Sequence, residues 1–232
     1  MDLIWGGAVQ AVELIVRVDH EVMSVTLLSL LVSGSATILS LLLGIPLGVI
    51  LALGNFPGRQ FIASAINMGM GLPPVVVGLF VTVFLWRNGP FGFLHILYTP
   101  TAMIIAQCII ASPVVAGLTM AAMQQLNPKL RLQILALGAN RYQMVWLLMA
   151  EARLPLLAAV MAGFGAVISE IGASMMVGGN VRGQTMVLTT ATVLETSRGN
   201  FGMAFALSLI LLVLVYVINV ILTSVQQRSR QP

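Results

Sequence analysis

Charged residues are scarce in this sequence: Asp, Glu, Lys and Arg make up 8% of its 232 residues, whereas hydrophobic residues make up 59%. A soluble domain usually carries about 25% charged residues, so this composition excludes an ordinary soluble domain and indicates an integral membrane protein. In a soluble protein the net charge of +4 would suggest a nucleic-acid partner. Here the basic residues lie between apolar runs and indicate membrane orientation, so we expect no nucleic-acid partner.

The sequence also lacks the residue patterns of metal sites and of familiar hydrolases. Its single cysteine, Cys108, excludes an internal disulfide and suits a packing role in an apolar run. The two histidines, His20 and His95, have no ligand spacing around them, so no metal site is expected. The ATP-binding pattern GxxxxGKS/T is absent, as are GxSxG and HExxH. We therefore expect no catalytic residue and no cofactor in this chain.

Five apolar runs are each long enough to cross a bilayer as a helix, which takes about 20 residues. The predicted spans are 25–53, 61–86, 100–123, 154–177 and 201–225. In the first span, Gly44 and Gly48 form a GxxxG pattern that allows close helix packing. Residues 3–18 mix apolar and polar side chains, which is typical of a helix lying in the membrane interface. The fold class predicted is therefore an all-α integral membrane protein.

The distribution of basic residues predicts the orientation of the chain. Five spans place the two termini on opposite sides of the membrane. If the loop after the third span is cytoplasmic, the inside holds Arg59, Lys129, Arg131, Arg141, Arg153, Arg228 and Arg230, and the outside holds Arg17, Arg87, Arg182 and Arg198. This bias follows the positive-inside rule. We predict an extracytoplasmic interfacial segment at 1–20, a transmembrane domain at 21–226 and a cytoplasmic tail at 227–232.

The loop at 127–155 is basic and carries the signals of two helices. Asn127 followed by Pro128 is typical of a helix start. Gly138 can end this helix, and Asn140 can cap a second one. Apolar residues recur at helical spacing, as Leu130, Ile134 and Leu137 in the first helix and as Tyr142, Val145, Trp146 and Met149 in the second. Two amphipathic helices between two membrane spans predict a docking element for another protein.

Two predicted spans contain residues that are unusual inside a membrane. Pro73 and Pro74 remove backbone donors, which is tolerated only where the backbone faces protein or a water-filled cavity. This break either lines a pathway or is a packing kink. Glu170 is the only acidic residue deep in a predicted span, where a charge is costly. We favour a role for it in gating or subunit contact, and the alternative is a hydrogen bond that holds two helices together.

These segments resemble the permease subunits of ABC importers. The loop is similar to the family's EAA loop at Ala136, Leu137, Gly138, Ala139, Leu154 and Pro155. The family's acidic residue is missing, because Leu132 stands at its position, and the loop is longer by about one helical turn. Residues 71–78 and 168–180 look like the permeases for molybdate, tungstate and sulfate. Residues 175–180 and the longer loop look most like the tungstate branch.

The resemblance implies the fold of a type I ABC importer permease with five transmembrane helices, working by alternating access. It also implies two copies of this chain, two copies of an ATPase subunit that binds ATP and magnesium, and an extracytoplasmic oxyanion-binding protein, all in a lipid membrane. The chain itself is then a permease and no enzyme. For ATPase coupling we select Ala136, Leu137, Gly138, Ala139 and Arg141. For the pathway or gate we select Gly71, Pro73, Pro74, Ser169, Glu170 and Gly172.

Two other classes of function are weighed against this one. A self-contained secondary transporter would suit the broken helix at Pro73 and Pro74 and the intramembrane carboxylate of Glu170. It would need no ATPase, but the sequence shows no inverted repeat. A membrane scaffold whose basic loop recruits a partner would leave the proline break and Glu170 unexplained.

Overall fold

The computed structural model describes Trp5, Val9, Glu13 and residues 20–228 of the chain. The interfacial helix predicted at 3–18 lies almost entirely outside the described residues, and so does most of the predicted tail at 227–232. Regular structure in the described part is helical throughout. The elements are α2 (His20–Leu53), α3 (Arg59–Met70), α4 (Pro74–Leu85), the 3-10 turn η1 (Gly92–Leu94), α5 (Pro100–Gln124), α6 (Pro128–Ala136), α7 (Arg141–Glu151), α8 (Arg153–Ile168), α9 (Gly172–Gly178), α10 (Leu188–Ser197) and α11 (Phe201–Arg228).

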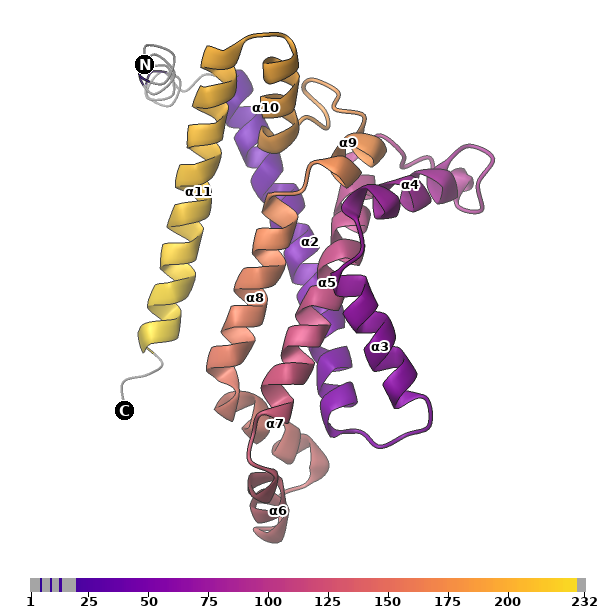
Figure 1. Ribbon diagram of the computed structural model, residues 1–232, viewed down its shortest axis with the longest axis vertical. Helices are drawn as coiled ribbons and strands as arrows, with labels where there is room; N and C mark the ends of the chain where they lie inside the picture. Colours follow the sequence, from indigo (N-terminus) through magenta and orange to yellow (C-terminus); the bar gives the residue numbers. More distant parts are fainter. Residues whose placement is uncertain (1–4, 6–8, 10–12, 14–19, 229–232) are drawn as a thin grey trace.

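Three helices are long and apolar enough to cross a membrane without a break, namely α2, α5 and α11. They confirm the first, third and fifth predicted spans. Pro46 lies inside α2 and does not end it. In Figure 1 these three helices run in the same direction along the long axis, and α3 and α8 return the chain between them. The described chain therefore enters at one end of the molecule and leaves towards the other.

The second and fourth predicted spans are each divided between two helices. The break predicted at Pro73 and Pro74 in the second span is confirmed, whereas the single helix predicted for the fourth span was wrong. α3 and α4 are bent by 104° relative to each other. Pro73 is the N-cap of α4 and Pro74 is its first residue, so neither offers the N–H that would continue α3. In the fourth span, α8 ends at Ile168 and the separate short helix α9 begins at Gly172. Figure 1 shows α4 and α9 side by side near one end of the bundle.

The predicted GxxxG pattern brings α2 against α5. A Cβ atom on Gly44 would lie 2.8 Å from the Cβ of Val115, and one on Gly48 would lie 2.6 Å from the carbonyl oxygen of Ala116. Both distances are too short for any other residue, so the two helices approach each other through these glycines. α5 also packs against α8, α3 and α9, which places it at the centre of the bundle.

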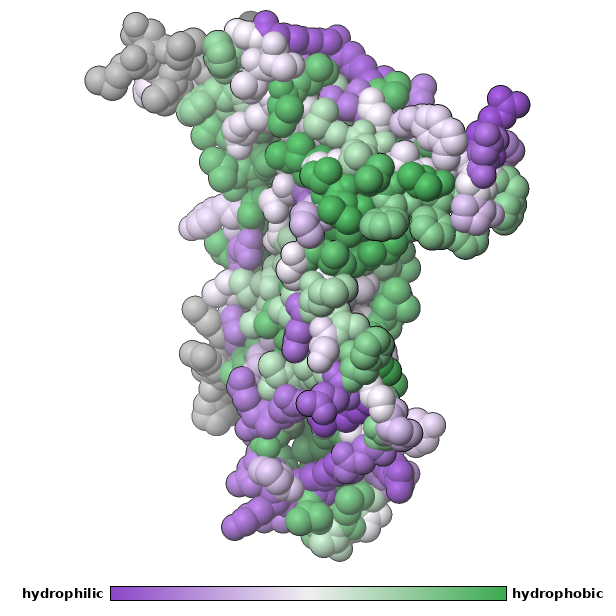
Figure 2. All heavy atoms as spheres, turned by 45° about the vertical axis from the view of Figure 1, so that its right-hand side comes forward, coloured by the Kyte–Doolittle hydropathy of each residue, from purple (hydrophilic) through white to green (hydrophobic). Residues whose placement is uncertain are grey.

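The surface is banded along the same axis. Figure 2 shows hydrophobic residues over the middle of the molecule and hydrophilic residues gathered towards its two ends. α11 is the most exposed of the long helices, with 17% of its most apolar window buried. Exposed apolar side chains between polar ends are what a protein surrounded by lipid requires.

Candidate functional site

The loop that was predicted to dock a partner forms a helix-turn-helix unit at one end of the bundle (Figure 1). The Asn127 side chain accepts a hydrogen bond of 2.9 Å from the N–H of Lys129 at the start of α6. Asn140 and Gln143 form a capping box at the start of α7, with two reciprocal bonds of 2.9 Å. Both predicted caps are therefore confirmed.

The turn between α6 and α7 depends on Gly138. Its φ angle is +87°, a left-handed conformation that glycine adopts without steric cost. Its N–H donates to the carbonyl of Leu135 at 3.0 Å, and the N–H of Ala139 donates to the carbonyl of Ile134 at 3.3 Å. These bonds satisfy carbonyls that the end of α6 leaves free. The predicted helix break at Gly138 is confirmed.

One face of this unit is buried against the bundle. Ile134, Met144 and Leu148 pack in one cluster with Met123 of α5 and Leu156 of α8. Helical spacing does not tell whether an apolar face meets the bundle or solvent. Leu137, Tyr142 and Trp146 of the predicted apolar faces are 88%, 90% and 72% exposed, so they face away from the bundle.

The residues predicted for ATPase coupling lie together at the exposed tip of the loop, around the turn between α6 and α7. Ala136, Leu137, Gly138 and Arg141 are exposed, and Ala139 is half-buried. The hydrophobic tip stands beyond a hydrophilic belt at the lower end of Figure 2. Large exposed apolar patches can mark contact surfaces for other proteins, and the exposed Leu137 is compatible with the predicted docking role, which stays a prediction.

Two arginines connect this end of the bundle to α2, a role that was not predicted from the sequence. Arg59 Nε donates to the carbonyl of Leu51 at 2.6 Å, and Arg131 Nη1 donates to the carbonyl of Leu53 at 3.1 Å. Both carbonyls belong to the last turn of α2, where the helix dipole favours positive charge. Arg131 thereby links the loop between α5 and α8 to α2 across 78 positions of the chain. Basic residues after an apolar run are the signal that could have indicated such a cap.

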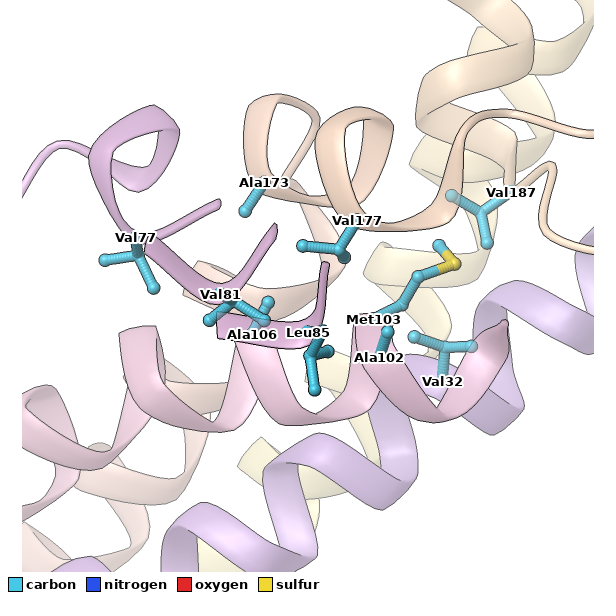
Figure 3. Close-up of a cluster of buried hydrophobic side chains, with 10 residues drawn as sticks. All are labelled: Val32, Val77, Val81, Leu85, Ala102, Met103, Ala106, Ala173, Val177 and Val187. Atoms are coloured by element: carbon cyan, nitrogen blue, oxygen red, sulfur yellow. The ribbon is translucent and has the colours of Figure 1, made fainter. Parts of the chain in front are cut away.

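The residues predicted for the pathway or gate lie at two breaks in the helical structure, one before α4 and one before α9. Gly71, Pro73 and Pro74 form the break before α4, and Ser169 and Glu170 form the break before α9. The two breaks meet because α4 packs on α9. Val77, Val81 and Leu85 of α4 face Ala173 and Val177 of α9 in a buried cluster that also includes residues of α5 (Figure 3).

Glycine sets the distance between α4 and α9. A Cβ atom on Gly78 would lie 2.7 Å from the Cα of Ala173, and one on Gly172 would lie 2.7 Å from Cγ2 of Val75. Gly172 was among the residues predicted for the gate, whereas Gly78, the last residue of the segment 71–78, was not. At Gly78 the contact is with backbone, which cannot rotate away as the Val75 side chain at Gly172 can, so a larger residue at Gly78 would push α4 and α9 apart.

Glu170 is buried, with 7% of its surface exposed, and it caps α9. Its Oε1 accepts a hydrogen bond of 2.7 Å from the N–H of Ala173, and its carbonyl accepts one of 3.1 Å from the hydroxyl of Thr189. Ser169 is exposed and its hydroxyl donates to the carbonyl of Gly165 at 2.7 Å. These bonds favour the structural alternative named for Glu170, because they join the break to α9 and α10 within one chain.

The two arginines at the other end of the bundle are paired. Arg182 forms an ion pair with Glu21 of α2. Arg198 donates to Oε1 of Glu195 at 2.9 Å, and Asn200 donates to Oε2 of the same carboxylate at 2.8 Å. These ion pairs and hydrogen bonds hold α10 and the loop before it against α2 and the start of α11.

Residues 44–231 match the model of a protein family described as binding-protein-dependent transport system inner membrane components. The chain belongs to this family. Within it, the chain is 38% identical to the tungstate uptake system permease protein of Peptoclostridium acidaminophilum over 98% of this chain and 100% of the relative. It is 34% identical to the tungstate uptake system permease protein of Campylobacter jejuni over 95% and 92% of the two chains. The molybdenum transport system permease protein of Escherichia coli K12 is 27% identical over 77% of this chain and 82% of its own length.

Solved structures of transporters from this group share the fold. An inward-facing structure of the MetNI methionine ABC transporter contains a chain with a TM-score of 0.72 and 19% identity, covering 91% of this chain and 95% of that one. The fold is that of a type I ABC importer permease. Members of this family are the membrane components of transport systems and not enzymes, and membership implies an ATPase and a binding protein as partners.

Removing the Glu170 carboxylate tests its role as a cap. Glu170→Ala leaves the buried N–H of Ala173 without an acceptor, so we expect a loss of about 1–2 kcal/mol in stability and reduced uptake. Glu170→Gln keeps an acceptor oxygen and should retain most of the stability. Thermal unfolding of the purified permease complex measures the first effect and uptake in cells the second. If Glu170→Ala unfolds and transports like the parent protein, Glu170 has neither the structural nor the gating role.

Proposed function

We propose that this chain is the permease subunit of an ABC importer for tungstate. The observation that carries the proposal is the 38% identity to a tungstate permease over nearly the full length of both chains. The molybdenum and sulfate permeases among the relatives are less similar, at 27% and 26% identity. Importers of molybdate or sulfate are the alternatives, since these oxyanions have similar charge and shape.

The assembly that we propose contains two copies of this chain, with the pathway between them. Two ATPase subunits bind ATP and magnesium on the cytoplasmic side, and a binding protein delivers the anion on the other side. The N-terminus is outside and the C-terminus is cytoplasmic. Arg59, Arg141 and Arg153 are the first residues of α3, α7 and α8, and Lys129 and Arg131 lie in α6. Figure 1 shows α6, α7 and the adjoining ends of α3 and α8 at one end of the bundle, and this gathering of basic residues supports the orientation.

In this proposal the exposed tip around Leu137 and Gly138 docks on the ATPase, and α5 carries its movement through the membrane. Met123 of α5 packs in the cluster beneath α6 and α7, and Met103 and Ala106 of the same helix pack beneath α4 and α9. A rigid helix that joins both clusters lets ATP-driven closure of the ATPases shift the gate by a rigid-body movement. The Glu170 carboxylate stabilises the break before α9 and does not bind the anion, because like charges repel.

Uptake measured in cells that lack their own oxyanion importers tests the substrate. Expression of this chain with its ATPase and binding protein should raise cellular tungsten strongly at trace tungstate. A tenfold excess of molybdate or sulfate should compete weakly. If molybdate or sulfate competes as well as unlabelled tungstate does, the assignment to tungstate is wrong and the importer is a general oxyanion system. If uptake persists without the ATPase, the chain is a secondary transporter.

A further inference from the structure

A small buried chamber lies beside the break between α8 and α9. Its volume is about 10 Å³, which is room for a single water molecule or a small ion. It is lined by Ser29 and Ser33 of α2, Gln107 of α5, Ile168 and Glu170 at the break, and residues 187–189 at the start of α10. The transport function proposed above assigns no role to this chamber.

The chamber has an acceptor without a donor. Gln107 is 2% exposed, and its Nε2 donates to the hydroxyl of Ser174 at 2.9 Å. Its Oε1 is buried and has no hydrogen-bond partner in the structure. A buried polar atom without a hydrogen-bond partner lowers the stability of the fold. This oxygen would therefore be stabilised by a cation or by a hydrogen-bond donor.

The chamber also has a carboxylate without a cation. Among the described residues, no basic side chain forms an ion pair with Glu170, and the lining of the chamber contains no Lys, Arg or His. Glu195, the other buried carboxylate, is paired with Arg198. Ionisable residues inside a membrane usually have a partner of opposite charge, because an isolated charge there is strongly unfavourable.

The end of α8 adds further negative charge. Ile168 is the last residue of α8 and lines the chamber, and the carbonyls at a helix C-terminus carry a partial negative charge. In transporters with discontinuous helices, such helix ends and unwound backbone carbonyls coordinate sodium. No group of three His, Cys, Asp or Glu residues gathers in the described part of the chain, so the site is not one for a transition metal.

We propose that this chamber binds one sodium ion. Its ligands are the carboxylate of Glu170, Oε1 of Gln107, the hydroxyl of Ser33 and a backbone carbonyl at the end of α8. The ion neutralises Glu170 and joins α2 and α5 to the break that precedes α9. Sodium thereby holds the gate region together, whatever anion the importer carries.

Thermal unfolding of the purified permease complex in detergent tests the site. The complex is compared in 150 mM sodium chloride and 150 mM choline chloride, so that ionic strength is constant. We expect sodium to raise the melting temperature of the parent protein by about 3 °C. Glu170→Gln keeps the cap of α9 but removes the charge, so the sodium effect should disappear. Glu195→Gln changes the other buried carboxylate in the same way and should keep the full sodium effect.

A second variant separates ion binding from folding. Ser33→Ala removes one ligand, and we expect the sodium concentration for half of the effect to rise several-fold while the complex still assembles. Equal melting temperatures in sodium and choline would overturn the proposal. A melting temperature that follows pH but not sodium would also overturn it.

Discussion

Gly138→Leu is expected to lower tungstate uptake about tenfold while the permease still assembles in the membrane. Gly138 has a φ angle of +87°, and a residue with a side chain pays about 1–2 kcal/mol in this conformation. If the turn relaxes to avoid this cost, Leu137 and Tyr142 no longer lie where, in our proposal, the tip docks on the ATPase. A change of about 1.4 kcal/mol in a docking equilibrium corresponds to a tenfold change in affinity. Uptake in cells and ATP hydrolysis by reconstituted complexes measure the two sides of the coupling.

Gly58→Leu is the matched control for this variant. Gly58 has a φ angle of +83°, and a Cβ atom on Gly58 or on Gly138 would meet no atom within 4 Å. The two variants therefore carry the same backbone strain in equally open surroundings, but only Gly138 lies in the loop between α6 and α7. Equal loss of uptake in both variants would mean that strain at this end of the protein is harmful in general, and the coupling role of Gly138 would be contradicted.

The features that the sequence predicted correctly are local ones. The caps at Asn127 and Asn140 depend on side-chain bonds to backbone groups two and three residues away, so their sequence signal is complete in itself. The long spans of α2, α5 and α11 follow from apolar runs of sufficient length. The pattern of Gly44 and Gly48 predicted a close helix contact on this face of α2, but it did not identify α5 as the partner.

The features that the sequence did not reveal depend on contacts between distant parts of the chain. Tyr142 and Trp146 have helical spacing on one face, but Met144 and Leu148 face the bundle, and the spacing alone fits either choice. The break before Gly172 was missed because it contains no proline and is stabilised by a carboxylate that read as a functional charge. The 104° bend was missed although Pro73 and Pro74 were noted, because prolines indicate a break without fixing its angle.

Gly78→Ala is expected to lower uptake about tenfold through the packing of α4 on α9. The new Cβ atom would lie 2.7 Å from the Cα of Ala173, which is backbone and cannot rotate away. Forcing a methyl group into such a contact costs about 1–3 kcal/mol, so α4 and α9 must separate. A transporter that alternates between two packings is sensitive to this, because a bias of about 1.4 kcal/mol changes their ratio tenfold. Uptake at saturating tungstate and the melting temperature of the complex are the measurements.

Gly165→Ala makes the same chemical change where there is room for it. Gly165 lies inside α8, and a Cβ atom there would meet nothing within 4 Å. Both substitutions raise helix propensity by up to about 1 kcal/mol, so Gly165→Ala should leave uptake unchanged and raise the melting temperature slightly. If Gly78→Ala behaves in the same way, α4 and α9 do not need their close contact and the gate must lie elsewhere. If only Gly78→Ala loses uptake, the contact between α4 and α9 is part of the transport cycle. Helix propensity cannot explain the loss, because the change from glycine to alanine raises it in both variants.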